Sequence, residues 1–311
     1  MCTALNSTKW GHFFGRTLDV ECYAPAKVVA VGRFYPFCFS CGEVLKNHLS
    51  ILGVSHVSGG VPLFYDGMNE AGLCCAALSF PPAVYFKEGG GFNLASYEII
   101  SYILSRFRTV REARAHLGNL RITDKSFSSD LPTTPLHWIC ADRTGAFVIE
   151  QTEGGLKIYD APHGILANAP EYPFHLHRIR EIAQLSNLEA EGRLCDGELA
   201  APYSSGFGAL GLPGDYSSSS RFLRVAFVES FCLPFEGHGG VDRFFTVMDT
   251  VKLPYGCVIG KGGSPNYTVY TCCMDTAAGV YHYSLYEDGK RRNVPFSSFS
   301  LDTDKLFSLP M

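Results

Sequence analysis

The chain has 311 residues, of which 46% are hydrophobic, and its formal net charge is −4. This composition supplies a large buried core but no basic surface, so we expect no nucleic-acid partner. No stretch approaches about 18 consecutive apolar residues, which argues against a membrane span, and no apolar segment follows a positive N-terminus. We therefore expect a cytoplasmic protein. Its 12 cysteines are too sparse for a disulfide scaffold and predict reduced thiols.

The first residues read MCTALNS, so removal of Met1 would make Cys2 the N-terminal residue. An α-amine and a thiol both ionise at about pH 8, and one Cα would then carry both groups. The amine can serve as the base for the sulfur nucleophile. The alternative interpretation is that Cys2 is merely a small residue that permits methionine removal.

Strands are predicted toward both ends of the chain, with helices grouped between them. WGHFFGRTLDV and AKVVAVGRF near the N-terminus are rich in aromatic and β-branched residues, and the final third returns to such runs at 266–275 and 279–287. A strand pair is also predicted over 61–80, with a turn at 66–72, and two strands are predicted over 135–152, with a turn at 142–145. Thr109 and Glu112 have the spacing of a helix N-terminus. The predicted helices cover 94–106, 109–118, 174–186 and 220–231. This arrangement is typical of a layered α+β protein and not of a βαβ repeat.

The remaining motifs predict no cofactor and no metal. Cys38 and Cys41 form a CxxC pair, but no second pair lies at zinc-finger spacing. His175 and His177 form an HxH of equally low specificity. The glycine run at 89–91 resembles no phosphate-binding loop. We interpret all three as packing, surface or loop residues.

Four polar residues lie in settings that suit amide hydrolysis by an N-terminal thiol. Arg16 and Asp19 follow an apolar strand, where a cation stabilises a thiolate and a carboxylate can orient the α-amine. Asn168, in GILANAPEY, offers a side-chain amide to a developing oxyanion. Arg221 lies in a first helical turn, which the macrodipole makes unfavourable for a cation, so a functional role is favoured. The alternatives are a local salt bridge and ordinary turn or surface residues.

Seven segments, taken together and in order, resemble the choloylglycine hydrolase family, whose members are bile salt hydrolases and penicillin V acylases of the N-terminal nucleophile type. The resemblance covers nearly the whole chain. Each segment alone is weak, but their joint order behind an N-terminal cysteine is specific. The segments are MCTAL, FFGRTLD, LFYDGMNEAGL, LPTTPLHWICAD, GILANAP, GLPGDYSSSSRFLR and NYTVYTCC.

The resemblance implies a fold and a set of site residues. The fold is a four-layer αββα sandwich of two antiparallel sheets, here one domain over 1–311. An excursion at about 187–212 matches the family's assembly arm and implies a homo-oligomer, which in that family is often a tetramer. By this resemblance Cys2 is the nucleophile, and Arg16 and Asp19 tune and hold it. Asn168 contributes to the oxyanion hole, and Arg221 is the second active-site arginine.

Substrate identity rests on fewer residues. Ser79 stands where bile salt hydrolases have Asn and penicillin V acylases have Tyr, and its main-chain N–H is implied to serve the oxyanion hole. We expect hydrolysis of glycine- or taurine-conjugated bile acids, with the small-molecule substrate on Leu18, Ser79 and 58–65. The alternatives are penicillin V, an N-acyl homoserine lactone or another acyl amide, a non-catalytic paralogue that binds acyl amides, and a papain-like Cys–His enzyme.

Overall fold

The computed structural model describes residues 1–20, 26–189, 202–260 and 262–311. Two antiparallel sheets dominate these residues. The first has eight strands in the order β13–β12–β11–β8–β7–β6–β3–β19. In that order the strands are Gly155–Asp160, Gly145–Thr152, Leu136–Asp142, Cys74–Ser79, Val61–Asn69, Ile51–Ser58, Lys27–Val31 and Leu306–Pro310.

The second sheet has seven strands in the order β14–β1–β2–β16–β17–β18, with β15 paired to β16. In that order, with β15 last, they are Ile165–Leu166, Cys2–Ser7, Phe13–Val20, Pro265–Asp275, Val280–Leu285, Arg291–Pro295 and Val258–Ile259. Strand β1 thus lies inside this sheet, between β14 and β2. The start of the chain is therefore fixed by neighbours on both sides.

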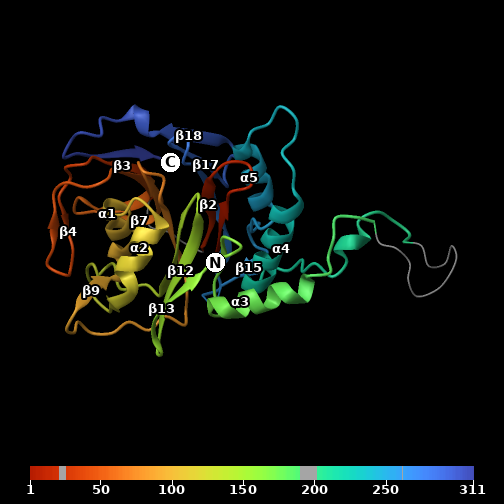
Figure 1. Ribbon diagram of the computed structural model, residues 1–311, viewed down its shortest axis with the longest axis horizontal. Coiled ribbons are helices and arrows are strands. Elements are labelled where there is room, and N and C mark those ends of the chain that lie inside the picture. The colour runs from red at the N-terminus through yellow and green to blue at the C-terminus, as the bar shows by residue number, and fades with distance from the viewer. Residues whose placement is uncertain (21–25, 190–201, 261) are drawn as a thin grey trace.

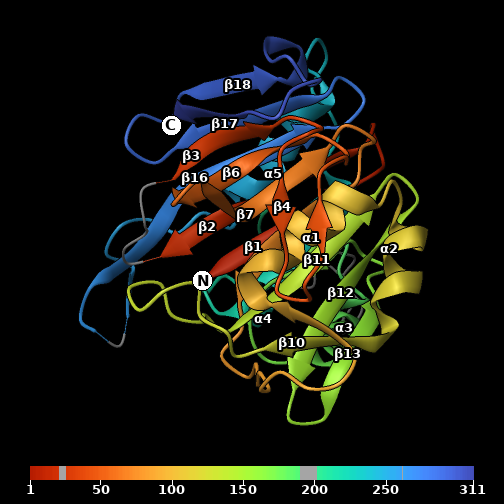
Figure 2. The same ribbon diagram turned by 90° about the vertical axis from the view of Figure 1, so that its left-hand side faces the viewer.

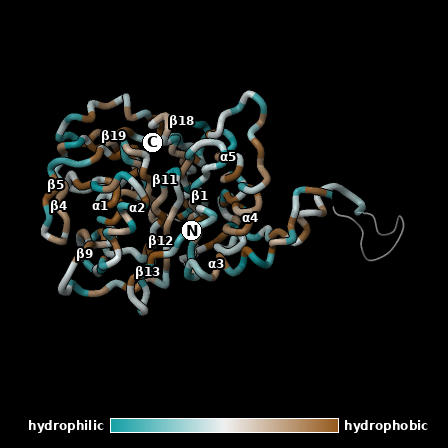
Figure 3. The backbone as a smooth tube through the Cα atoms, viewed as in Figure 1, coloured by the Kyte–Doolittle hydropathy of each residue, from teal (hydrophilic) through white to brown (hydrophobic). Residues whose placement is uncertain are grey.

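Helices cover the outer face of each sheet (Figure 1). Helices α1 (Ile99–Arg106) and α2 (Val110–His116) pack on the eight-stranded sheet. On the other sheet lie α4 (Ser218–Phe231) and α5 (Gly240–Asp249), with α3 (Tyr172–Ile179) against α4. Hydrophobic stretches run through the strands in the middle of the molecule (Figure 3). These layers confirm the predicted αββα sandwich.

Two short strand pairs complete the described structure. Strands β4 (Phe37–Cys38) and β5 (Val44–Leu45) form a hairpin, and β9 (Phe92–Ala95) pairs in parallel with β10 (Leu120–Thr123). No helix among the described residues is long and apolar enough to cross a membrane.

Several local predictions are confirmed. Thr109 begins α2, and its hydroxyl accepts a hydrogen bond from the Glu112 main chain at 3.2 Å. The predicted strand pair around 61–79 and the turn at 142–145 are present as β7–β8 and β11–β12. Gly15 allows close approach of two strands, because a Cβ there would lie 2.0 Å from the Cys272 carbonyl oxygen.

Three helix predictions need correction. Residues 94–98 are not α-helical: β9 pairs with β10 there, and a 3₁₀ turn at Ser96–Glu98 precedes α1. The helix predicted at 174–186 is shorter, since α3 ends at Ile179 and a 3₁₀ turn follows at Arg180–Ile182. No helix was predicted at α5, because the sequence predicted only strands beyond the helix at 220–231. The phenylalanine, valine and threonine residues of α5 favour strands, but its apolar face packs on β2 and β16.

The predicted excursion at 187–212 is only partly described. Residues 190–201 of it lie outside the described residues. On either side, the described segments extend away from the two sheets (Figure 1). Leu188, Tyr203 and Leu210 expose 71%, 91% and 72% of their surface there.

Candidate active site

Cys2 begins β1 at one end of the inter-sheet layer and is only 2% exposed. In the register of the sheet it lies opposite Leu18 of β2. Figure 2 shows the N-terminus beside the C-terminal end of β2. A cavity of about 340 Å³ opens at this point, and Cys2, Arg16, Leu18 and Ser79 all contribute to its lining. Hydrogen bonding of β1 to β14 and β2 therefore fixes the predicted nucleophile, Cys2, at the wall of this cavity.

Asn168 and Arg221 bind both polar groups of the Cys2 main chain. The Cys2 nitrogen donates to Asn168 Oδ1 at 2.8 Å, and Arg221 Nη1 donates to the Cys2 carbonyl at 2.6 Å. Arg221 Nη2 also donates to Asn168 Oδ1 at 2.7 Å, and Nη1 donates to Thr3 Oγ1. Both side chains are buried, so these hydrogen bonds are little weakened by water. Three residues that are far apart in the chain form one rigid unit.

Asp19 is buried behind this unit. Its carboxylate accepts from Thr268 Oγ1 at 2.6 Å and from Thr17 Oγ1 at 3.2 Å, and Arg221 Nη1 lies 3.8 Å away. A bulge in β16 follows Thr268 and changes its register against β2. With Met1 attached, the acceptor for the Cys2 nitrogen is Asn168, whereas the sequence assigned the orienting role to Asp19. Asp19 lies beside Arg221, which in turn binds the Cys2 carbonyl.

Arg16 is buried beside Cys2. Its Nη1 donates to the Ala77 carbonyl at 2.7 Å, and its Nε donates to the Thr17 carbonyl at 3.2 Å. Its Nη2 has no hydrogen-bond partner among the described residues. Burial lowers the pKa of Arg16, but the negative potential of Cys2, Tyr270 and Asp66 raises it above the usual arginine value. Arg16 thus stays cationic next to the sulfur, where a cation favours the thiolate.

The net effect of burial and neighbouring charges on the pKa is different for Arg221 than for Arg16. Burial lowers its pKa, and Arg224 adds to that effect, while Asp19 and Cys2 raise the pKa; the net shift is below the usual value. An arginine remains charged even so, because its ordinary pKa lies far above neutrality. The site therefore holds two buried guanidinium groups against one sulfur and one carboxylate.

Ser79 lines the cavity and is hydrogen-bonded to Asn168. Asn168 Nδ2 donates to the Ser79 carbonyl at 2.7 Å. Phe80 donates its main-chain N–H to the carbonyl of Pro135, the residue just before β11, at 2.9 Å. Because neighbouring residues of an antiparallel strand point their N–H groups to opposite edges, the Ser79 N–H points away from β11. It lies on the edge of β8 at which Asn168 binds.

The rest of the cavity wall is mostly apolar. Leu18 and residues 63–65 line it, whereas residues 58–62 of the segment 58–65 proposed for the substrate are not among the lining residues. Side chains from a second segment, 127–138, also contribute, and the sequence analysis did not identify them. This wall faces the polar residues around Cys2 and suits a large apolar ligand. Its main apolar side chains are Leu18, Leu63, Phe64, Phe127, Leu131 and Leu136.

Sequence reasoning also missed a buried carboxylate near Arg16. Asp66 accepts from Tyr270 Oη at 2.5 Å and from Tyr281 Oη at 2.6 Å. Burial raises its pKa, and Arg16 and the hydroxyl donors only partly offset that effect. Asp66 was assigned to a turn because it is followed by polar residues and glycine, but it lies in β7. No local sequence signal would have placed it beside Arg16.

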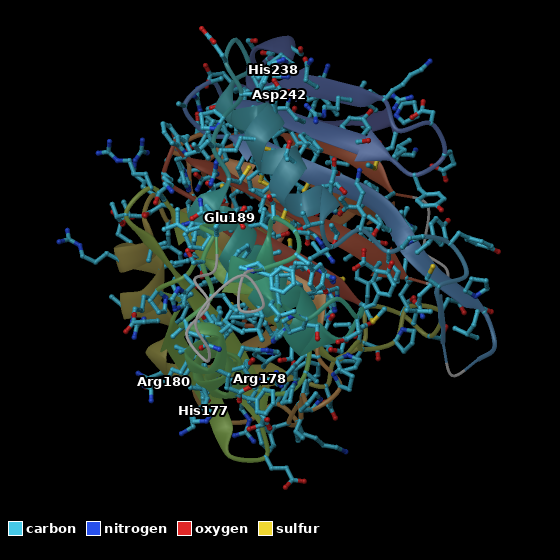
Figure 4. All side chains as sticks on the ribbon, turned by 90° about the vertical axis from the view of Figure 1, so that its right-hand side faces the viewer. His177, Arg178, Arg180, Glu189, His238 and Asp242 are labelled. Carbon is cyan, nitrogen blue, oxygen red and sulfur yellow. The ribbon has the colours of Figure 1, made fainter. Side chains whose placement is uncertain are left out.

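The described residues contain no group of His, Cys, Asp and Glu side chains that could hold a metal ion. His175 is buried, and its Nε2 donates to the Asn168 carbonyl at 2.9 Å. His177 lies on the outer surface of α3 near Arg178 and Arg180 (Figure 4). The two histidines of the HxH pair thus face different surroundings.

Two antiparallel sheets between helical layers, with the first residue after Met1 at the head of a cavity, define the architecture of N-terminal nucleophile hydrolases. The chain belongs to the linear amide C–N hydrolases of the choloylglycine hydrolase family, whose model matches residues 2–308. The resemblance inferred from sequence motifs is thereby confirmed.

Similar proteins cover the full length of the chain. A bile salt hydrolase/transferase from Lactiplantibacillus plantarum is 36% identical over 100% of this chain and 97% of its own length. A bile salt hydrolase/transferase from Clostridium perfringens is 33% identical over 98% of this chain and 95% of its own.

Solved structures agree with this placement. The crystal structure of a mutant conjugated bile acid hydrolase from Clostridium perfringens has a TM-score of 0.91 and 31% identity, covering 99% of this chain and 96% of that one. A penicillin V acylase from Agrobacterium tumefaciens has a TM-score of 0.79 at 18% identity, covering 100% of this chain and 91% of that one. The latter likeness concerns the fold alone.

Proposed function

We propose that this enzyme hydrolyses the amide bond of glycine- or taurine-conjugated bile acids, with Cys2 as nucleophile after removal of Met1. The observation that carries the proposal is the binding of both Cys2 main-chain groups by Asn168 and Arg221 at the head of a largely apolar cavity. Relatives named for bile salt hydrolysis match the chain over its full length.

The reaction begins with transfer of the thiol proton of Cys2 to its own α-amine. The sulfur attacks the amide carbonyl carbon, and a tetrahedral intermediate with a negative oxygen forms. The C–N bond then breaks, the nitrogen leaves with the proton from the α-amine, and a thioester remains on Cys2. Water, deprotonated by the same amine, attacks the thioester, and the bile acid leaves as the thiol is restored.

The negative oxygen of the intermediate needs donors on one side of the cavity. Asn168 Nδ2 and the Ser79 N–H lie on the same edge of β8, which supports them as that pair of donors. Arg16, beside Cys2, stabilises the thiolate before attack. Arg221 and Asp19 keep the Cys2 main chain in place during both steps.

The apolar wall supports a steroid as the acyl part. Its leucine and phenylalanine side chains offer a surface without a fixed charge, while the polar residues lie at the head of the cavity. A second acyl group is also a candidate, because Ser79 matches neither the Asn of bile salt hydrolases nor the Tyr of penicillin V acylases at this position. The second candidate is therefore phenoxyacetyl or another acyl amide, cleaved by the same chemistry.

We infer further that residues 1–311 form one domain and that the excursion at 187–212 joins subunits of a homo-oligomer. One hydrophobic core includes residues of both sheets and of α4 and α5. The exposed apolar side chains at Leu188, Tyr203 and Leu210 would be covered by a neighbouring copy. That the oligomer is a tetramer and that the protein is cytoplasmic stay predictions. Measuring the mass of the oligomer in solution by light scattering tests the first of them.

The test is a product assay with the intact protein mass recorded on the same sample. Glycocholate, taurocholate and penicillin V are offered separately to the purified enzyme. We expect loss of Met1 and release of free cholate from both bile salts. Cleavage of penicillin V alone would favour the second candidate. Loss of Met1 without turnover of any of the three would contradict the bile salt and penicillin V assignments. It would leave another acyl amide as substrate, or a protein that only binds acyl amides.

A further inference from the structure

The segment that carries Asn168 is irregular, yet its main chain is held at several points. Strand β14 ends at Leu166 and α3 begins at Tyr172, so no ladder or helix fixes the residues between them. The Asn168 N–H donates to Ser218 Oγ at 2.8 Å, and its carbonyl accepts from His175 at 2.9 Å. A catalytic side chain on a loop needs such support, because small displacements reduce rate strongly.

Two further buried side chains bind the ends of this segment. His137 Nε2 donates to the Ala167 carbonyl, immediately before Asn168, at 2.8 Å. Its Nδ1 lies 3.0 Å from Glu150 Oε1. Both oxygens of Glu150 in turn accept the Tyr172 N–H, each at 3.1 Å. His137 and Glu150 are 0% and 1% exposed, so the pair lies entirely inside the protein.

The chemistry of the partners determines where hydrogens lie. A carbonyl oxygen only accepts, so the Nε2 atom of His137 must carry a hydrogen. The Nδ1 atom and the Glu150 carboxyl then share one further proton, which makes the pair neutral as a whole. Such a fully satisfied buried pair holds its neighbours rigidly, whereas loss of one member leaves the other unpaired.

His137 also touches the opposite side of the oxyanion site. Its ring stacks on Phe80 with centroids 4.4 Å apart and an interplanar angle of 6°. Phe80 directly follows Ser79, as Ala167 directly precedes Asn168. One imidazole therefore contacts the neighbours of both oxyanion donors. It does so from behind, because His137 is not among the residues that line the cavity.

We propose that His137 and Glu150 are positioning residues for hydrolysis: together they hold the 167–172 segment so that the Asn168 amide meets the developing oxyanion. This inference rests on the proposed function, in which Asn168 is an oxyanion donor. Neither side chain reaches the substrate, so the effect of the pair is transmitted through the Ala167 carbonyl and the Tyr172 N–H.

Two substitutions separate positioning from general stability. His137→Phe keeps a ring to stack on Phe80 but removes both ring nitrogens. Glu150→Gln retains an acceptor for Tyr172 and supplies a donor for a neutral His137. The matched control is Asp142→Asn, because Asp142 similarly accepts the first N–H of α2, from Val110 at 2.7 Å, at the other end of β11.

We expect His137→Phe to lower kcat about 10- to 100-fold, with KM changed less than about twofold. Glu150→Gln should stay within about threefold of the unmodified enzyme, since both hydrogen bonds can form. Asp142→Asn should also stay within about threefold even where its Tm falls. Activities are measured on folded protein and normalised by N-terminal sequencing for processed Cys2.

A double-mutant cycle decides whether the effect passes through Asn168. In an Asn168→Ala background, His137→Phe should lower kcat by less than about twofold. An equal loss in both backgrounds, or an unchanged kcat in the single variant, overturns the inference and leaves the proposed function intact. If Asn168→Ala itself retains normal kcat, the oxyanion role fails and the inference fails with it. Should His137→Phe not fold, Glu150→Leu replaces it in the same cycle.

Discussion

The cavity has two sides that are held in different ways. The polar floor consists of Cys2 and Arg16, which line the cavity, and of Asp19, Asn168 and Arg221, which are buried around them. The apolar wall consists of Leu18, Leu63, Phe64, Phe127, Leu131 and Leu136, most of which are half-buried. Floor residues bind one another through directional hydrogen bonds, whereas wall residues provide apolar surface for contact with a ligand. Chemistry therefore depends on the floor's geometry, and substrate choice depends on the wall's shape.

The largest effect is expected on the floor, at the nucleophile. Cys2→Ala should lower kcat at least about 10⁴-fold, because no other group can form the thioester. Cys257→Ala, at an exposed thiol elsewhere, is the control and should leave activity unchanged. Steady-state release of cholate from glycocholate measures both. Substantial turnover by the Cys2 variant would exclude the covalent mechanism.

Asn168→Ala should be the next most harmful change. Loss of one oxyanion donor costs about 10²–10³ in kcat. The alanine also frees the Cys2 nitrogen and Arg221 Nη2 from their shared acceptor, so some loss of stability should accompany it. The kcat of purified, processed enzyme and its Tm are the measurements. A loss confined to Tm would assign Asn168 a structural role only.

On the wall, changes should act on KM and leave kcat nearly constant. Phe127→Ala or Leu131→Ala removes apolar surface worth about 1.5 kcal/mol or more, so KM for a bile salt should rise about tenfold. Leu233→Ala, at a residue 68% exposed and outside the cavity, is the control. A fall in kcat with constant KM would mean that wall and floor are not separable.

The smallest effect is expected where floor and wall meet. Ser79→Ala should change kcat less than about twofold, because the Ser79 groups that face Asn168 belong to the main chain. The ratio of rates on glycocholate and penicillin V is the sensitive measurement. A large shift in that ratio would show that the hydroxyl takes part in substrate choice.

Local patterns in the chain determined much of the fold. Apolar runs rich in aromatic and β-branched residues, together with turn chemistry, predicted β2, β3, β7, β8, β11 and β12, and Thr109 predicted the start of α2. They failed at α5, whose residues favour strands by themselves and become helical by packing on β2 and β16. They also failed at 94–98, where a helix was predicted but β9 pairs with β10 instead.

The sequence by itself determined which residue types were available for chemistry: a cysteine behind Met1, two arginines, an aspartate and an asparagine in recognisable segments. Tertiary structure decided their partners. Asn168 lies 166 residues from Cys2, and Arg221 lies 219 residues away. It also decided that, with Met1 attached, Asn168 accepts from the Cys2 nitrogen, and that His137 and Glu150 lie behind the site. Hydrogen bonds between such distant residues depend on sheet register and layer packing, which no local pattern encodes.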